Sequence, residues 1–174
     1  MVYKITKRRQ RSDIDMDKDQ LIKEIETAFK DVILKDGIGI NEADRMEMGN
    51  RDVLIQKGRN LDRMWWNSWM DIEDKYMASY SSVMDYMDAA GMKWVMPAYM
   101  TYIIDHYKEG SFSVDSTIYT LEAGALGSDK LDLYTEEQKR VIAEFLQFML
   151  NAGEKWVDVE SAQNALDKVW GEYL

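Results

Sequence analysis

The stretch from Asp85 to Tyr107 constrains the fold of this chain more than any other part of it. It holds the only proline and the only histidine of the 174 residues, Pro97 and His106, within the densest run of large apolar side chains. Several of those side chains recur at intervals of three and four, as on one face of a helix: Ala98, Tyr99, Tyr102, Ile103 and Tyr107. We therefore expect residues 85–107 to form the buried spine of the protein.

Glycine and proline predict a break inside this spine. Ser81 or Ser82 is a suitable N-cap for a helix that Gly91 would end. Pro97 is tolerated in the first turn of a helix, where its missing N–H is not needed, so the next helix should begin near Met96. A helix that began earlier, at Met92, would have to be kinked by the proline.

Capping signals mark the helices on either side. Thr135 and Gln138 form a capping box that predicts a helix as far as Gly153, and Asp158 should cap a last helix. Asp17, with Gln20 at the third helical position, predicts a first helix ending near residues 36–37. Weaker patterns predict a brief helix capped by Asn41 and running through Met48, a short helix or ordered loop at 51–63, and a short helix near 116–123.

These patterns together indicate an all-α fold. No strand pattern of comparable length and no internal repeat is present. A chain of 174 residues that is 46% hydrophobic can bury one substantial core but is too short for two comfortable domains. We predict a single-domain orthogonal bundle of five to seven helices over residues 13–174, preceded by a basic flexible arm at residues 1–12.

The charges are unevenly distributed along the chain. Five cationic side chains precede the first acid, Asp13, and removing them from the net charge of −10 leaves a body of −15; they are Lys4, Lys7, Arg8, Arg9 and Arg11. Such a body repels phosphate backbones and attracts basic surfaces. Nucleic-acid binding is therefore disfavoured except through the basic arm, and a basic protein partner is favoured.

Composition also bears on the compartment. The chain has no cysteine, which excludes disulfides and thiolate chemistry and fits a reducing environment. It shows neither the apolar region of a signal peptide nor a run of about 18 uncharged apolar residues. We expect a cytoplasmic protein without a membrane span.

The residues do not form a recognisable catalytic motif. His106 would have to be the base of any Ser-His-Asp triad, and no Gly-x-Ser-x-Gly turn supplies a nucleophile. Phosphate-binding and dinucleotide-binding glycine motifs are also missing. We assign no catalytic, metal-binding or cofactor-binding residue. Acids are plentiful, however, and a carboxylate-dependent hydrolase with Asp85, Asp88 and His106 near one cleft is the alternative hypothesis.

The candidate partner-binding residues lie in the tryptophan-rich stretch that follows Arg63. Trp65 and Trp69 are four residues apart and would share a face if the stretch were helical. Aromatic clusters of this kind serve as protein hot spots, although they also cover the ends of small helical cores. The candidates are Trp65, Trp66, Trp69, Asp71, Glu73 and Asp74.

Four short motifs resemble an uncharacterised family of small bacterial proteins. They are Gly37-Ile-Gly-Ile-Asn-Glu-Ala43, Tyr86-Met-Asp-Ala-Ala-Gly91 running into Trp94-Val-Met-Pro-Ala-Tyr-Met100, Tyr134-Thr-Glu-Glu-Gln138, and Trp170-Gly171. The residues from Asp62 to Ile72 also look similar, so the resemblance spans roughly Asp17 to Leu174. The chain departs from the family pattern at Lys93-Trp94-Val95-Met96, where Arg-Phe-Tyr-Leu is more usual. The resemblance implies a bacterial origin and brings no activity with it.

Charge and the tryptophan cluster therefore direct the functional prediction. We expect a non-catalytic, acidic protein-binding protein, most plausibly of the immunity or antitoxin kind, that masks the basic surface of a partner such as a toxin.

Overall fold

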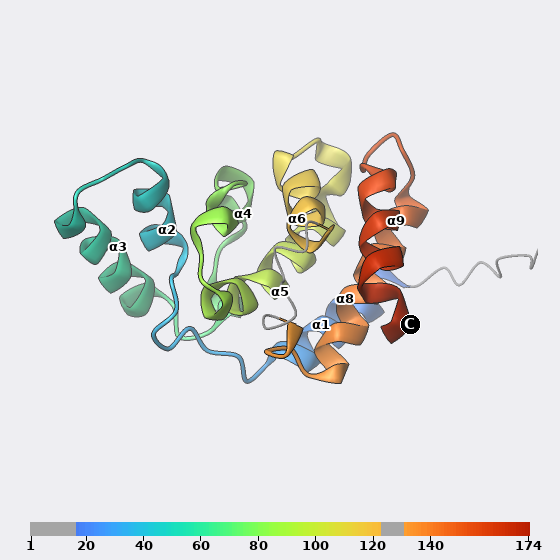
Figure 1. Cartoon of the computed structure of the whole chain (residues 1–174), viewed down its shortest axis with the longest axis horizontal. Helices are drawn as coiled ribbons and strands as arrows, with labels where there is room; N and C mark the ends of the chain where they lie inside the picture. Colours follow the sequence, from blue (N-terminus) through green and yellow to red (C-terminus); the bar gives the residue numbers. More distant parts are fainter. Residues whose placement is uncertain (1–16, 123–130) are drawn as a thin grey trace, which may run out of the picture.

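Every regular element of the protein is helical in the residues that the computed structural model describes, 17–122 and 131–174 (Figure 1). These ranges contain eight α-helices, one more than the upper limit of the predicted five to seven. The α-helices are α1 (Lys18–Phe29), α2 (Ile40–Glu47), α3 (Asp52–Trp65), α4 (Asp74–Ser79), α5 (Ala89–His106), α6 (Phe112–Glu122), α8 (Glu136–Ala152) and α9 (Val159–Lys168). The same ranges contain four 3-10 helices: η1 (Trp69–Asp71), η2 (Val83–Tyr86), η3 (Tyr107–Glu109) and, after α9, η4 (Trp170–Tyr173). The basic arm lies outside the described residues.

The helices form an elongated array with α5 running through its middle (Figure 1). The hairpin of α2 and α3 occupies one end, and α6, α8 and α9 gather at the other. Helix α1 packs against both α8 and α5, and α5 also contacts α4, α6 and η1. Helix α3 packs chiefly on α2, and α2 also packs on η2, so α3 is the most peripheral helix of the described fold.

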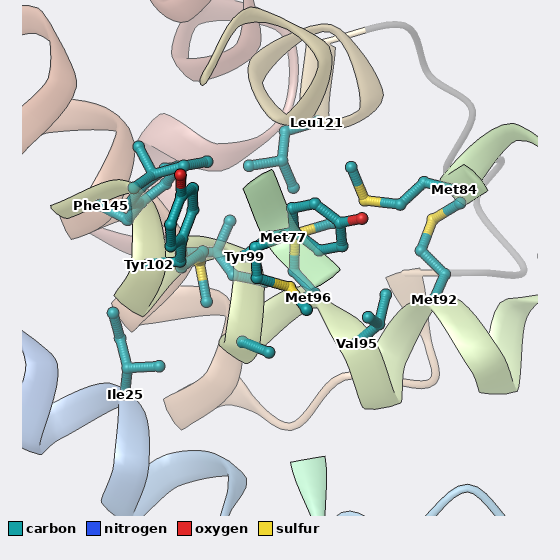
Figure 2. Close-up of a cluster of buried hydrophobic side chains, with 14 of the residues drawn as sticks. Ile25, Met77, Met84, Met92, Val95, Met96, Tyr99, Tyr102, Leu121 and Phe145 are labelled. Carbon is teal, nitrogen blue, oxygen red and sulfur yellow. The ribbon is translucent and has the colours of Figure 1, made fainter. Parts of the chain in front are cut away.

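The prediction of a buried spine is confirmed by α5. Its apolar side chains are buried around the whole helix rather than on one face, and Trp94, Tyr99, Met96 and Met100 are among the largest fully buried ones. Side chains from other elements meet it in one cluster, including Ile25 of α1, Met77 of α4, Leu121 of α6 and Phe145 of α8 (Figure 2). The core is therefore built around residues 89–106.

The predicted break inside this spine was wrong. Helix α5 begins at Ala89, so Gly91 lies in its first turn, and Pro97 lies in its interior. Pro97 has no N–H to donate to the carbonyl of Lys93, a defect that costs about 3 kcal/mol in an exposed helix. Burial of the whole helix among apolar neighbours outweighs that local cost. The preceding segment forms the short 3-10 helix η2 rather than the α-helix expected from Ser81 or Ser82.

The first helix is shorter than predicted. Asp17 is the N-cap, as expected, and its side chain accepts the N–H of Asp19 at 3.2 Å; Gln20, however, bonds Glu24 instead of completing a capping box. The helix ends at Phe29, where the backbone N–H of Val32 and side chains from elsewhere donate to its last carbonyls. The indole of Trp69 donates to Phe29 O at 3.0 Å, and Gln138 donates to Ala28 O at 3.0 Å.

Local capping signals located the two C-terminal helices correctly. Thr135 and Gln138 form the predicted reciprocal box at the start of α8, and Gly153, at a φ of +86°, ends it. Asp158 caps α9 by accepting the N–H of Ser161 at 3.1 Å. Here the sequence pattern and the tertiary packing favour the same boundaries.

Candidate partner-binding surface

A solvent-facing hollow lies where the end of α3 meets η1 and the start of α4. It has a volume of about 450 Å³ and is lined by Met64, Trp65, Trp66, Asp71, Glu73 and Tyr76. We call these six residues the Trp65 hollow. Four of the predicted partner-binding residues belong to it: Trp65, Trp66, Asp71 and Glu73.

The tryptophans do not share a helix face, contrary to the prediction. Helix α3 ends at Trp65, and Trp66 has an extended backbone that turns the chain away from the helix. Trp69 consequently points inward from η1, where it is 3% exposed and bonded to Phe29. Of the three, only Trp65 presents a large surface to solvent, with 45% of it exposed.

The aromatic rings of the hollow meet edge to face. The centroids of Trp65 and Trp66 are 6.0 Å apart with the rings at 75°, and those of Trp66 and Tyr76 are 4.8 Å apart at 88°. Trp66 is buried and also lies 6.1 Å from Trp94 of the spine. The half-exposed ring of Trp65 is therefore supported by a ring that is fixed to the core.

Two carboxylates stand at the rim of the hollow. Asp71 is held by the backbone, because its Oδ2 accepts the N–H groups of Asn67 and Ser68 at 3.0 and 2.9 Å. Glu73 forms an exposed ion pair with Lys75, and the hydrogen bond from Lys75 to Glu73 raises the pKa of the lysine. The ammonium of Lys75 also lies 5.3 Å from the centre of the Tyr76 ring.

The remaining two predicted residues, Trp69 and Asp74, lie at a different site. They line a smaller hollow of about 170 Å³ together with residues of α1, η1, α4 and α5. The six candidates are thus divided between two neighbouring depressions, and the Trp65 hollow holds the exposed aromatic surface.

Helix α3, and with it Trp65, is positioned by a buried carboxylate. Asp62 is fully buried, and its two oxygens accept the backbone N–H of Asn41 at 2.8 Å, the side-chain amide of Asn41 at 2.9 Å and the N–H of Glu42 at 3.0 Å. It therefore caps the first turn of α2 from α3, in place of the predicted cap by Asn41. Burial raises the pKa of Asp62, although these hydrogen bonds act in the opposite direction.

A second polar contact joins the two helices of the hairpin. Glu42 is 1% exposed, and its carboxylate accepts the Nε–H of Arg59 at 3.0 Å and a further bond from the guanidinium. Neither Glu42 nor Asp62 stood out in the sequence, because their partners lie 17 and 20–21 residues away. The close approach of Gly58 of α3 to the Asn41 carbonyl was equally hidden.

The hairpin is joined to the spine at a junction around Gly91. Asp88 Oδ1 accepts the N–H of Gly91 at 2.8 Å, as the N-cap of α5, and the N–H of Ile38 at 3.0 Å. Arg63 donates to the carbonyls of Lys35 at 2.9 Å and Gly37 at 3.2 Å. Three of the stretches that carry the family resemblance, those at 37–43, 62–72 and 86–91, therefore meet here.

The residues of the alternative enzymatic hypothesis do not share a cleft. Asp88 caps the start of α5 and His106 is its last residue, 18 positions later, which places them about 27 Å apart along the helix. The His106 ring stacks on Tyr102, with centroids 4.5 Å apart, and its Nδ1 lies 2.9 Å from the Tyr102 carbonyl. The imidazole therefore packs against the last turn of α5.

Asp85 lines another hollow, of about 520 Å³, between η2 and α6. Its walls include Asp115, Phe112, Tyr119 and several hydroxyl side chains. Asp115 accepts the N–H of Asp158 at 3.2 Å, and the Tyr119 hydroxyl donates to Asp158 at 3.0 Å. Over residues 17–122 and 131–174, no cluster of three or more acidic or histidine side chains is arranged to hold a metal ion.

Within the described residues, no helix combines the length and apolar character needed to cross a bilayer.

These features define an all-α protein that carries an acid-rimmed aromatic hollow beside a peripheral helical hairpin. The chain belongs to DUF6714, a family of unknown function, whose model matches residues 17–174. The resemblance noted over roughly the same span is thereby confirmed at the level of an uncharacterised family. No curated protein and no solved structure matches the chain.

Proposed function

We propose that the protein binds another protein through the Trp65 hollow and thereby masks a basic surface of that partner, in the manner of an immunity or antitoxin protein. The observation that carries this proposal is the placement of Trp65, which exposes 45% of its surface beside a buried aromatic support and two carboxylates. Tryptophans in such surroundings are frequent binding hot spots.

The surface around Trp65 supports this role. Met64, which lines the hollow, is 69% exposed, and Met70, which lines the neighbouring smaller hollow, is 50% exposed. Methionine adapts its shape to a partner at little cost, and tryptophan loses little conformational entropy on binding. Together they supply the apolar centre of a protein contact, and the carboxylates supply its polar rim.

Charge supports a basic partner. The body of the chain carries a net charge of −15 without its first twelve residues, and Glu73 at the hollow is well exposed. Attraction between an acidic surface and a basic one accelerates association and is weakened by salt. An immunity-like role needs such fast association, because a toxic partner must be captured before it acts.

Replacing Trp65 with alanine should therefore reduce the affinity for the native partner by roughly 30-fold or more, the loss of about 2 kcal/mol typical of a hot spot. The partner is recovered from the native host at low salt with the wild-type chain as bait, and its affinity is measured by calorimetry. Met48→Ala is the matched control, since Met48 is 69% exposed at the end of α2 and does not line the hollow. Equal losses in both variants, or none in either, would contradict the proposal.

The second candidate function is a carboxylate-dependent hydrolase, and the hollow that holds Asp85 and Asp115 is the observation in its favour. If it is right, the purified protein hydrolyses a member of an ester, phosphoester and glycoside panel, and Asp85→Asn reduces the rate at least 100-fold. Hydrolysis that survives this substitution would rule out Asp85 as a catalytic residue.

A further inference from the structure

An ammonium group of the chain itself, that of Lys75, contacts two of the residues that line the Trp65 hollow. Lys75 lies over the face of Tyr76, with its Nζ 5.3 Å from the ring centroid, and forms an ion pair with Glu73. Both Tyr76 and Glu73 line the hollow, although Lys75 does not. Tyr76 and Glu73 are therefore both within reach of an ammonium group.

The geometry of the rings suits a cation. The face of an aromatic ring carries partial negative charge and attracts an ammonium within about 6 Å of the centroid. Because Trp66 is nearly perpendicular to both Trp65 and Tyr76, the hollow has aromatic walls in more than one orientation. Asp71 and Glu73 add negative charge at the rim, and the volume of about 450 Å³ lies within the range of small-ligand sites, roughly 300–1,000 Å³.

Another ammonium group can easily displace Lys75 from Glu73 and Tyr76. The side chains of Lys75 and Glu73 are 66% and 60% exposed, and ion pairs this exposed contribute little to stability. The cation–π contact of Lys75 is likewise of the weak, exposed kind. An ammonium group that could also reach the ring of Trp65 would gain contacts that Lys75 lacks.

We propose that the Trp65 hollow binds an ammonium group, a lysine or methylated-lysine side chain of the partner, and that Lys75 is a built-in competitor for it. That the ammonium group belongs to a protein rests on the proposed function. That the hollow binds an ammonium group does not. Displacement of Lys75 frees both Glu73 and the face of Tyr76 for the incoming cation.

The direct test follows the six tryptophan indole N–H signals of the full chain by NMR during titration with tetramethylammonium chloride, with sodium chloride at equal ionic strength as the control. Signals of Trp65 and Trp66, assigned with Trp65→Phe and Trp66→Phe, should shift in a saturable way with tetramethylammonium alone. Trp170 is an internal reference, because it is fully buried and its indole donates to Leu121 O at 3.0 Å. Identical shifts with both salts would overturn the proposal.

The competitor is tested with Lys75→Met, which should raise the affinity for tetramethylammonium roughly three-fold, as expected for loss of a weak exposed contact. Lys23→Met, on α1, removes an equal charge from an exposed lysine outside the hollow and should leave the affinity unchanged. An equal gain in affinity in both variants would show that Lys75 acts only through its contribution to the net charge.

The two proposals can fail separately. If Trp65→Ala abolishes partner binding but tetramethylammonium shifts no signal in either wild type or Lys75→Met, the ammonium site is wrong and the partner-binding surface stands. If tetramethylammonium binds but Trp65→Ala leaves partner binding unchanged, the partner-binding surface alone is wrong.

Discussion

Replacing Gly91 with alanine is expected to lower the free energy of unfolding by at least about 3 kcal/mol, or to prevent folding altogether. A Cβ at this position would lie 2.0 Å from the Ile38 carbonyl oxygen and 2.9 Å from its carbon. The obstacle is backbone, so no side-chain rotation can relieve it. The same clash would break the two hydrogen bonds by which Asp88 joins Ile38 to the start of α5.

Urea denaturation followed by circular dichroism measures this effect, with Gly49→Ala as the matched control. Gly49 has a φ of +64° but no atom near its missing side chain, so alanine there should cost only about 1 kcal/mol. Similar stabilities for the two variants would show that the loop at Ile38 can move away from α5, and the junction would not be rigid.

The second large effect is expected from Asp62→Ala, which should lower the free energy of unfolding by about 3–4 kcal/mol. The substitution removes the acceptor of three hydrogen bonds and leaves the N–H groups of Asn41 and Glu42 buried without a partner. Asp52→Ala, at an exposed position of the same helix, should cost less than about 1 kcal/mol. A small loss of stability in Asp62→Ala would mean that water accepts the hydrogen bonds in place of the carboxylate.

The pH dependence of Asp62→Asn isolates the charge of this carboxyl group. Since burial raises the pKa of Asp62, the folded chain takes up the proton at a higher pH than the unfolded chain does. Wild type should therefore gain stability relative to Asp62→Asn as the pH falls from about 7 towards about 4, near the unfolded pKa of an aspartate. A difference that shrinks over this range would show that the hydrogen bonds, rather than burial, dominate.

The sequence predicted those parts of the fold in which local chemistry decides the structure. The box at Thr135 and Gln138 needs only residues three positions apart, so it located α8 correctly. Likewise, the apolar density of residues 89–106 is enough to predict burial. The end of α1 was not predicted, and the side chains that bond its last carbonyls, Trp69 and Gln138, lie 40 and 110 residues further along the chain, beyond the reach of a local pattern.

The sequence pointed to most of the residues that line the candidate site but did not predict how they are arranged. Trp65, Trp66, Asp71 and Glu73 do line one hollow, but their meeting depends on the chain leaving the helix at Trp66, which no helical spacing indicates. Tyr76, which forms the other aromatic wall, was absent from the prediction. Its contribution follows from the packing of α4, and a six-residue helix leaves only a weak sequence pattern.

The peripheral position of the α2–α3 hairpin has a thermodynamic consequence for binding. Met64 and Trp65 of α3 line the Trp65 hollow together with Tyr76 of α4, whereas α3 packs chiefly on α2. Helix α2 is itself anchored on η2, so α3 is the less firmly held helix of the hairpin, and an element with few tertiary contacts opens at a lower free energy than the core around it. Any partner that bridges α3 and α4 must also hold the hairpin closed, so binding and hairpin closure are linked equilibria. If the proposed function holds, substitutions at Asp62 and Gly91, which do not line the hollow, should also lower the apparent affinity for the partner.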